Sequence, residues 1–116
     1  MGLDWIGFQQ TDDDDYIQEM YRGKGVAQDV NFSKQFSKLI DKCYGSQKSP
    51  HPEICGCDYI PEEEKQEIID AIRTLIELPE EEIEFDDSND THQEWKDWME
   101  GAISFLEENE YVFCWY

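Results

Sequence analysis

The chain has 116 residues and carries 29 aspartates and glutamates against nine lysines and arginines, which gives a formal net charge of −20. Its hydrophobic fraction of 39% and aromatic fraction of 14% exclude a disordered acidic tail, because such tails have too few apolar side chains to form a core. We therefore expect residues 1–116 to form a single acidic globular domain, which is the commonest domain size.

The N-terminal segment predicts a strand followed by a helix. Gly2 to Phe8 is rich in β-forming residues and is expected to be a strand. Thr11 and the four aspartates after it, residues 12–15, are typical of a helix N-cap and an acidic first turn. Apolar side chains at helical spacing extend this predicted helix: Tyr16, Ile17, Met20 and Tyr21.

The middle of the chain predicts a short extended piece, a second helix and a loop. The extended piece is Val26 to Val30. The helix is expected from Phe32 to Tyr44, because apolar residues fall on one face and Gly45 follows its end. That face consists of Phe32, Phe36, Leu39, Ile40 and Cys43. The loop runs from Ser46 to Tyr59 and is rich in proline and glycine.

Two longer helices are predicted in the C-terminal half. The third helix begins at Pro61 and ends before Pro79, and its apolar stripe is Ile68, Ile69, Ile72, Leu75 and Ile76. Residues 82–85 are expected to be a short strand or a turn, and residues 86–90 a loop. Thr91 and Glu94 have the spacing of a capping box and start the fourth helix. Its apolar residues are Trp95, Trp98, Met99, Ala102, Ile103 and Leu106, and Asn109 is expected to cap its end.

Residues 111–116 have the composition of a strand, as the first residues of the chain do. We expect the N- and C-terminal strands to pair in a small sheet on which about four helices pack. The predicted fold class is therefore α+β.

Four metal-ligand residue types lie close together in the sequence: Cys43, His51, Cys55 and Cys57. Zinc favours such soft or borderline donors, and loops supply them readily, so one structural zinc is a hypothesis. The spacing is not that of a common zinc finger, and the alternative is that Cys43 is a buried small apolar residue and the others are ordinary loop residues. The cofactor prediction is accordingly none, or one zinc.

Oxygen donors between residues 86 and 97 follow the spacing of a calcium loop: Asp86, Ser88, Asp90, Glu94 and Asp97. Thr91 stands where the sharp turn of such a loop needs glycine, and Asp97 replaces the bidentate glutamate. The capping-box interpretation therefore takes precedence, with weak divalent-cation binding as the alternative.

An enzyme is not expected. The chain has no nucleophile frame and no P-loop spacing, and with so many acids a carboxylate pair identifies no general acid or base. No stretch approaches the about 18 apolar residues of a membrane span, and the first residues do not resemble a secretory signal. We therefore expect a cytoplasmic or host-intracellular protein with no membrane partner.

The charge is unevenly distributed along the chain. Residues 1–21 carry six acids and no base, residues 22–49 carry six bases and two acids, and residues 50–116 carry 21 acids and three bases. Such a field repels nucleic acid and attracts basic proteins. The partner-binding residues predicted from the densest acidic runs are Glu62, Glu63, Glu80, Glu81, Glu82, Asp86, Asp87, Glu94 and Asp97.

The predicted function is to bind and block a basic protein surface that itself binds nucleic acid. In size and charge alone, the chain resembles the small acidic viral proteins that inhibit restriction and CRISPR nucleases, a resemblance that implies nucleic-acid mimicry. The alternative is a structural or adapter subunit of a larger assembly, with a possible zinc-stabilised loop.

Overall fold

The two ends of the chain form neighbouring strands, because both are runs of aromatic and branched residues that suit a half-buried sheet. β1 (Asp4–Gln10) pairs antiparallel with β4 (Tyr111–Trp115), and Ile6 lies opposite Phe113. The computed structural model describes residues 4–13, 15–21, 26–45, 47–85 and 91–115. It confirms the α+β class and the predicted pairing of the terminal strands.

The segment predicted as the first helix is a strand. β2 (Tyr16–Tyr21) pairs antiparallel with β1 over its whole length, with Tyr16 opposite Gln10. Asp12, Asp13 and Asp15 lie in the turn of this hairpin, where the Thr11 N–H donates to the Asp15 carbonyl at 2.8 Å. The helix prediction is wrong because apolar spacing over only six residues is a weak signal, and pairing with β1 imposes the extended form.

A third pairing completes the four-stranded antiparallel sheet, whose order is β2-β1-β4-β3 with β3 at Asp58–Ile60. Because side chains alternate along a strand, the two faces of the sheet differ. The face toward the helices contributes Trp5, Ile60, Val112 and Cys114 to the main core. The opposite face carries a second cluster of Ile6, Phe8 and Phe113, on which Ile54, Cys55 and Cys57 of the loop before β3 pack.

The structure divides the helix predicted over residues 32–44. α1 (Val30–Gln35) ends at Phe36, whose φ of −129° and ψ of 40° leave the helical region. The 3₁₀ turn η2 (Ser37–Leu39) and α2 (Ile40–Cys43) follow. Gly45 ends α2, as predicted, at a φ of 68° that favours glycine.

The predicted extended piece over residues 26–30 is also wrong. Its first three residues form the 3₁₀ turn η1 (Val26–Gln28), which buries Val26 and Ala27. Asp29 then caps α1, so the two valines belong to a turn and a helix start and not to a strand.

α3 (Glu62–Ile76) and α4 (His92–Glu108) confirm the two long helices predicted from periodicity. The Thr91 side chain accepts a hydrogen bond from the Glu94 N–H at 3.1 Å, and Asn109 caps the other end of α4. Between the helices lies the 3₁₀ turn η3 (Glu80–Glu82). The apolar stripes of α3 and α4 are buried in the main core, with Ile68, Ile72, Leu75, Met99 and Leu106 fully covered.

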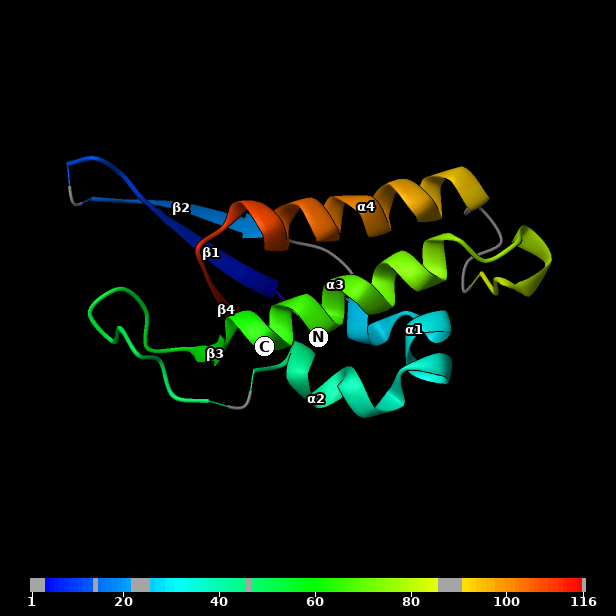
Figure 1. Ribbon diagram of the computed structural model, residues 1–116, viewed down its shortest axis with the longest axis horizontal. Helices are drawn as coiled ribbons and strands as arrows, with labels where there is room; N and C mark the ends of the chain where they lie inside the picture. The colour runs from blue at the N-terminus through cyan, green and yellow to red at the C-terminus, as the bar shows by residue number, and fades with distance from the viewer. Residues whose placement is uncertain (1–3, 14, 22–25, 46, 86–90, 116) are drawn as a thin grey trace.

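Figure 1 shows that α3 and α4 lie side by side and run in opposite directions, with α1 and α2 along the other side of α3. The β1–β2 hairpin reaches beyond the helices at one end of an elongated molecule of 47 × 26 × 25 Å. Within the described ranges, no helix combines the length and the apolar character needed to cross a membrane.

Replacing Asp29 by alanine is expected to lower the free energy of unfolding by about 2–4 kcal/mol. The Asp29 carboxylate is buried, accepts the N–H groups of Asn31 and Phe32 at the start of α1, and accepts the Trp95 Nε1–H at 3.1 Å. Alanine removes the cap and leaves a buried indole N–H without this acceptor. Urea unfolding followed by tryptophan fluorescence measures the loss. A change below about 1 kcal/mol, the cost of one exposed cap, would contradict this role.

Candidate functional site

The outer surfaces of α3 and α4 are acidic because the inward positions of both helices are apolar and carboxylates occupy most of the outward ones. These two helices together expose ten carboxylates in the described structure. On α3 they are Glu62, Glu63, Glu67 and Asp70, with Glu77 at its C-cap counted as the fifth, and on α4 they are Glu94, Asp97, Glu100, Glu107 and Glu108. We call this surface the α3–α4 acidic face.

The cations of the same two helices do little to offset this charge. Lys65 is 4% exposed, and its ammonium donates to the Asn109 carbonyl at 2.8 Å and pairs with Glu62 at 3.1 Å. Arg73 pairs with Glu107 at 3.1 Å. Lys96, which is half-buried, is the remaining cation of α3 and α4. The acidic face therefore keeps a net negative charge.

The locally basic middle segment pairs with one carboxylate of α3 and with one that follows η3. Lys34 of α1 pairs with Glu84 at 2.8 Å, and Lys42 of α2 pairs with Glu67. Glu67 belongs to α3, whereas Glu84 follows the 3₁₀ turn η3. Within the acidic face, this segment therefore offsets the charge of Glu67.

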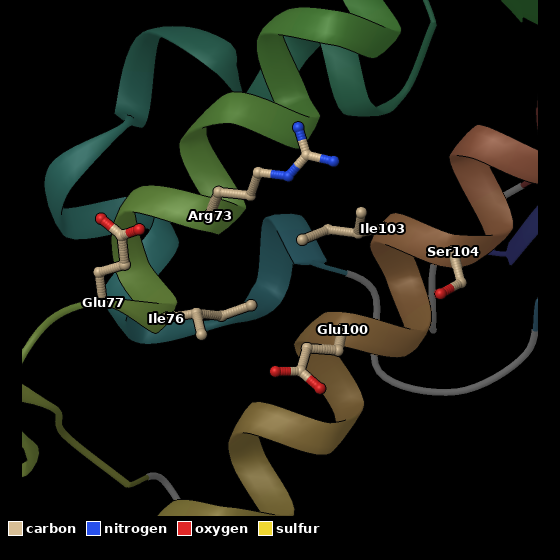
Figure 2. Close-up of a pocket in the computed structure, with 6 residues that line it drawn as sticks. All are labelled: Arg73, Ile76, Glu77, Glu100, Ile103 and Ser104. Atoms are coloured by element: carbon tan, nitrogen blue, oxygen red, sulfur yellow. The ribbon is translucent and has the colours of Figure 1, made fainter.

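A pocket of about 410 Å³ opens between the two helices within the acidic face. Figure 2 shows the side chains of Ile76 and Ile103 directed into the gap and Arg73 reaching from α3 toward α4. The Glu100 carboxylate also points toward α3, whereas the Glu77 carboxylate turns outward at the rim. Ser104 completes the lining.

This lining suits a cationic side chain with an apolar stem. Long basic residues lay their methylene groups on apolar surface and keep the charged head among polar groups. Ile76 and Ile103 offer the apolar surface, and Glu77 and Glu100 offer the carboxylates. The charge of Arg73 is already compensated by Glu107.

The partner-binding residues predicted from the sequence do not form one patch. Glu80, Glu81 and Glu82 of η3 and Glu94 and Asp97 at the start of α4 lie at one end of the helix pair, whereas Glu62 and Glu63 lie at the other. The 15 residues of α3 separate the two groups by about 22 Å. Asp86 and Asp87 lie outside the described residues.

Sequence reasoning missed the acids beside the pocket, Glu77 and Glu100. It followed runs of consecutive acids, whereas these two stand alone in the sequence and share a pocket only because α3 and α4 pack together. Helical spacing could have indicated both acids. Residues 70, 73 and 77 share one outward stripe that runs along α3 to its C-cap, and residues 97, 100 and 104 share one outward stripe of α4.

The four residues of the zinc hypothesis lie on two sides of the sheet. Cys43 is buried in the main core, whereas Cys55 and Cys57 pack on the second cluster across the sheet. His51 stacks on Tyr111, with 4.8 Å between ring centroids, and its Nδ1 lies 3.2 Å from Glu53. Across the described ranges, no three His, Cys, Asp or Glu side chains are grouped as metal ligands. The structure therefore does not bring the proposed ligand set together.

The calcium-loop candidate falls largely on residues 86–90, which lie outside the described structure. Of its two described donors, the Asp97 carboxylate accepts a hydrogen bond within α4 from Gln93 at 2.8 Å. Glu94 stands in the first turn of α4, where its N–H donates to the Thr91 side chain.

The four thiols are expected to react in two classes. Burial raises the pKa of Cys43 to about 12 and also raises the pKa of Cys114, so both stay protonated and enclosed in the core. Cys55 and Cys57 are only half-buried. Ellman's reagent should modify the latter pair promptly and the buried pair only on unfolding in denaturant. Equally fast modification of all four thiols in the native protein would contradict the burial of Cys43 and Cys114 in the core.

Comparison of the chain with protein-family models, with curated proteins and with solved structures found no match.

Proposed function

We propose that the protein binds a basic surface of another protein through the α3–α4 acidic face. The observation that supports this most is the exposure of ten carboxylates on two adjacent helices whose own cations are buried, half-buried or paired. A net charge of −20 on 116 residues adds self-repulsion to the folded state, which a binding role would explain.

We further propose that the basic surface is one that holds nucleic acid. The 17 residues of α4 span about 26 Å, and a DNA duplex of that length carries about 15 phosphates. Ten carboxylates along the same length approach that charge density. Lysines and arginines arranged to bind phosphates would meet a similar field on the acidic face.

The pocket supports the same proposal because it offers a place for one basic side chain to become enclosed. Affinity in protein interfaces is concentrated in a few anchoring residues, and arginine is prominent among them. A lysine or arginine of the partner would rest its stem on Ile76 and Ile103 and direct its head to Glu100. Flanking carboxylates would then guide association and set its salt dependence.

Capture from a lysate of the source organism tests the proposal. The tagged protein is immobilised and washed at about 50 mM and about 500 mM salt, a range over which the Debye length falls several-fold. We expect basic, nucleic-acid-binding proteins to be retained at low salt and released at high salt. Retention of acidic or neutral proteins, or retention that ignores salt, would contradict the proposal.

The alternative proposal is an adapter subunit that docks through its apolar C-terminal strand. Trp115 of β4 supports it, because this large side chain is 58% exposed. An adapter contact of this kind would survive high salt and would be lost on Trp115→Ser. Binding to the basic surface would be unaffected by that substitution, so the same capture experiment separates the two proposals.

A further inference from the structure

One edge of the sheet is open to another strand. The order β2-β1-β4-β3 leaves β2 and β3 at the edges, and the short β3 is extended by a bridge between Gln47 and Tyr59. On β2, the four residues from Tyr16 to Glu19 are all exposed. Figure 1 shows that this part of the hairpin projects beyond the helices.

Over the described residues, β2 lacks several of the features that usually protect a sheet edge from further pairing. Such features are charged side chains, above all lysines, and also prolines, bulges or a covering segment, and Glu19 is the one charged residue of β2. β2 has no lysine and no proline, and its six residues pair with β1 in unbroken register, so it contains no bulge. It also exposes two large apolar side chains, Ile17 at 58% and Tyr16 at 38%.

The negative charge around the β2 edge favours a basic strand as its binding partner. Residues 1–21 carry six acids and no base, and the turn beside the exposed part of β2 presents Asp12, Asp13 and Asp15. A second copy of the chain would bring an identical acidic hairpin and a second net charge of −20 against the first. A strand bearing lysine or arginine would meet favourable charge instead.

The register of β2 also defines a side-chain pattern. Ile17 and Glu19 point to the same side of the sheet, because residues two apart share a face. The Glu19 carboxylate is held in place by the Asn109 side chain, whose Nδ2 donates to it at 3.1 Å. An added strand would therefore place an apolar residue beside Ile17 and, two residues away, a basic residue beside Glu19.

We infer that the β2 edge binds an extended segment in which basic and apolar residues are interspersed, as a fifth antiparallel or parallel strand. Main-chain hydrogen bonds to β2 would supply affinity, and Ile17 and Glu19 would supply selectivity. This surface goes beyond the α3–α4 acidic face, because it lies on a different element and recognises backbone as well as charge.

A pair of matched peptides tests the inference on the purified protein. The probe is an acetylated and amidated Thr-Thr-Lys-Thr-Val-Thr-Thr peptide, whose valine and lysine are two residues apart and share one face. Two derivatives carry N-methyl groups at alternate positions, so that each derivative is blocked along one edge of its strand. Because only one edge can pair with β2, one derivative should bind like the parent and the other about tenfold more weakly, the cost of roughly one or two hydrogen bonds. Amide chemical shifts of the labelled protein should change at residues 16–19.

Two substitutions of equal charge provide the control. Ile17→Lys places a protecting lysine on the edge and should weaken peptide binding about tenfold or more, whereas Thr74→Lys on the exposed side of α3 should change it less than about threefold, as expected for a remote surface charge. Equal binding of both N-methylated peptides, or shifts confined to α3 and α4, would overturn the inference. So would a dimer of the free protein that Ile17→Lys dissociates.

The result is independent of the proposed function. Substitutions on the acidic face, such as Glu77→Lys with Glu100→Lys, should retain the difference between the two N-methylated peptides. If lysate capture fails while that difference persists, the proposed function is wrong and the edge site stands.

Discussion

Gly7→Ala is expected to destabilise the protein by about 2–3 kcal/mol, the range for overpacking a closed site. A Cβ at this position would lie 2.3 Å from Cγ and 2.4 Å from Oδ1 of Asn109. The asparagine cannot simply rotate away, because its Nδ2 donates to Glu19 of β2 and to the Phe105 carbonyl at the end of α4. The added methyl group would therefore force apart the sheet and the last turn of α4.

A double-mutant cycle checks this explanation. Asn109→Gly removes all three asparagine atoms that the new Cβ would meet, so it should cost stability alone but relieve much of the Gly7→Ala effect when combined with it. Urea unfolding of the four proteins gives the coupling energy. Additive losses would show that the close approach of Gly7 and Asn109 is not what makes glycine necessary.

Gly101→Ala is the matched control for Gly7→Ala. Gly101 is an exposed position of α4 where an added Cβ would meet nothing within 4 Å. Alanine should raise the free energy of unfolding by about 0.5–1 kcal/mol, because it has the higher helix propensity. The same substitution is thus expected to have opposite signs at the two glycines.

The largest expected effect on binding comes from reversing two charges beside the pocket. Glu77→Lys combined with Glu100→Lys should weaken the complex with the captured basic partner by about a hundredfold at low salt, because each reversal replaces an attraction by a repulsion. Both residues line the pocket between α3 and α4. Isothermal titration or surface plasmon resonance measures the change.

The control for this variant reverses two exposed acids elsewhere. Asp41→Lys with Glu53→Lys changes the net charge by the same amount, but these residues lie on α2 and in the loop before β3. A loss below about threefold is expected from screening of distant charges. Equal losses for the two double variants would mean that binding depends on net charge alone and not on the acidic face.

The parts of the fold that the sequence predicts well are those in which one pattern extends over several turns. The stripes of α3 and α4 repeat through 15 and 17 residues and match no strand period. The six residues of β2 are too few to separate the two periods, and its pairing with β1 is a contact that no local pattern specifies. For the same reason, the break at Phe36 is a consequence of packing and is invisible in the periodicity.

The candidate site could be predicted from the sequence only in part. Net charge and its uneven distribution are properties of the sequence, so an acidic surface could be expected. The geometry of this surface could not be predicted, because Glu77 and Glu100 line the same pocket only when α3 packs on α4. Cys43 and Cys55 show the opposite case. They are close in sequence and were therefore predicted to share a zinc site, but they lie on opposite faces of the sheet.

Displacement of nucleic acid from the captured partner is the most direct test of the proposed function. A fluorescent duplex bound to that partner is titrated with the protein, and its anisotropy is followed. We expect the protein to release the duplex, the Asp41→Lys/Glu53→Lys variant to do the same, and the Glu77→Lys/Glu100→Lys variant to need about a hundredfold higher concentration. A duplex that stays bound while the protein also binds, or release by all three proteins at equal concentration, would contradict recognition through the α3–α4 acidic face.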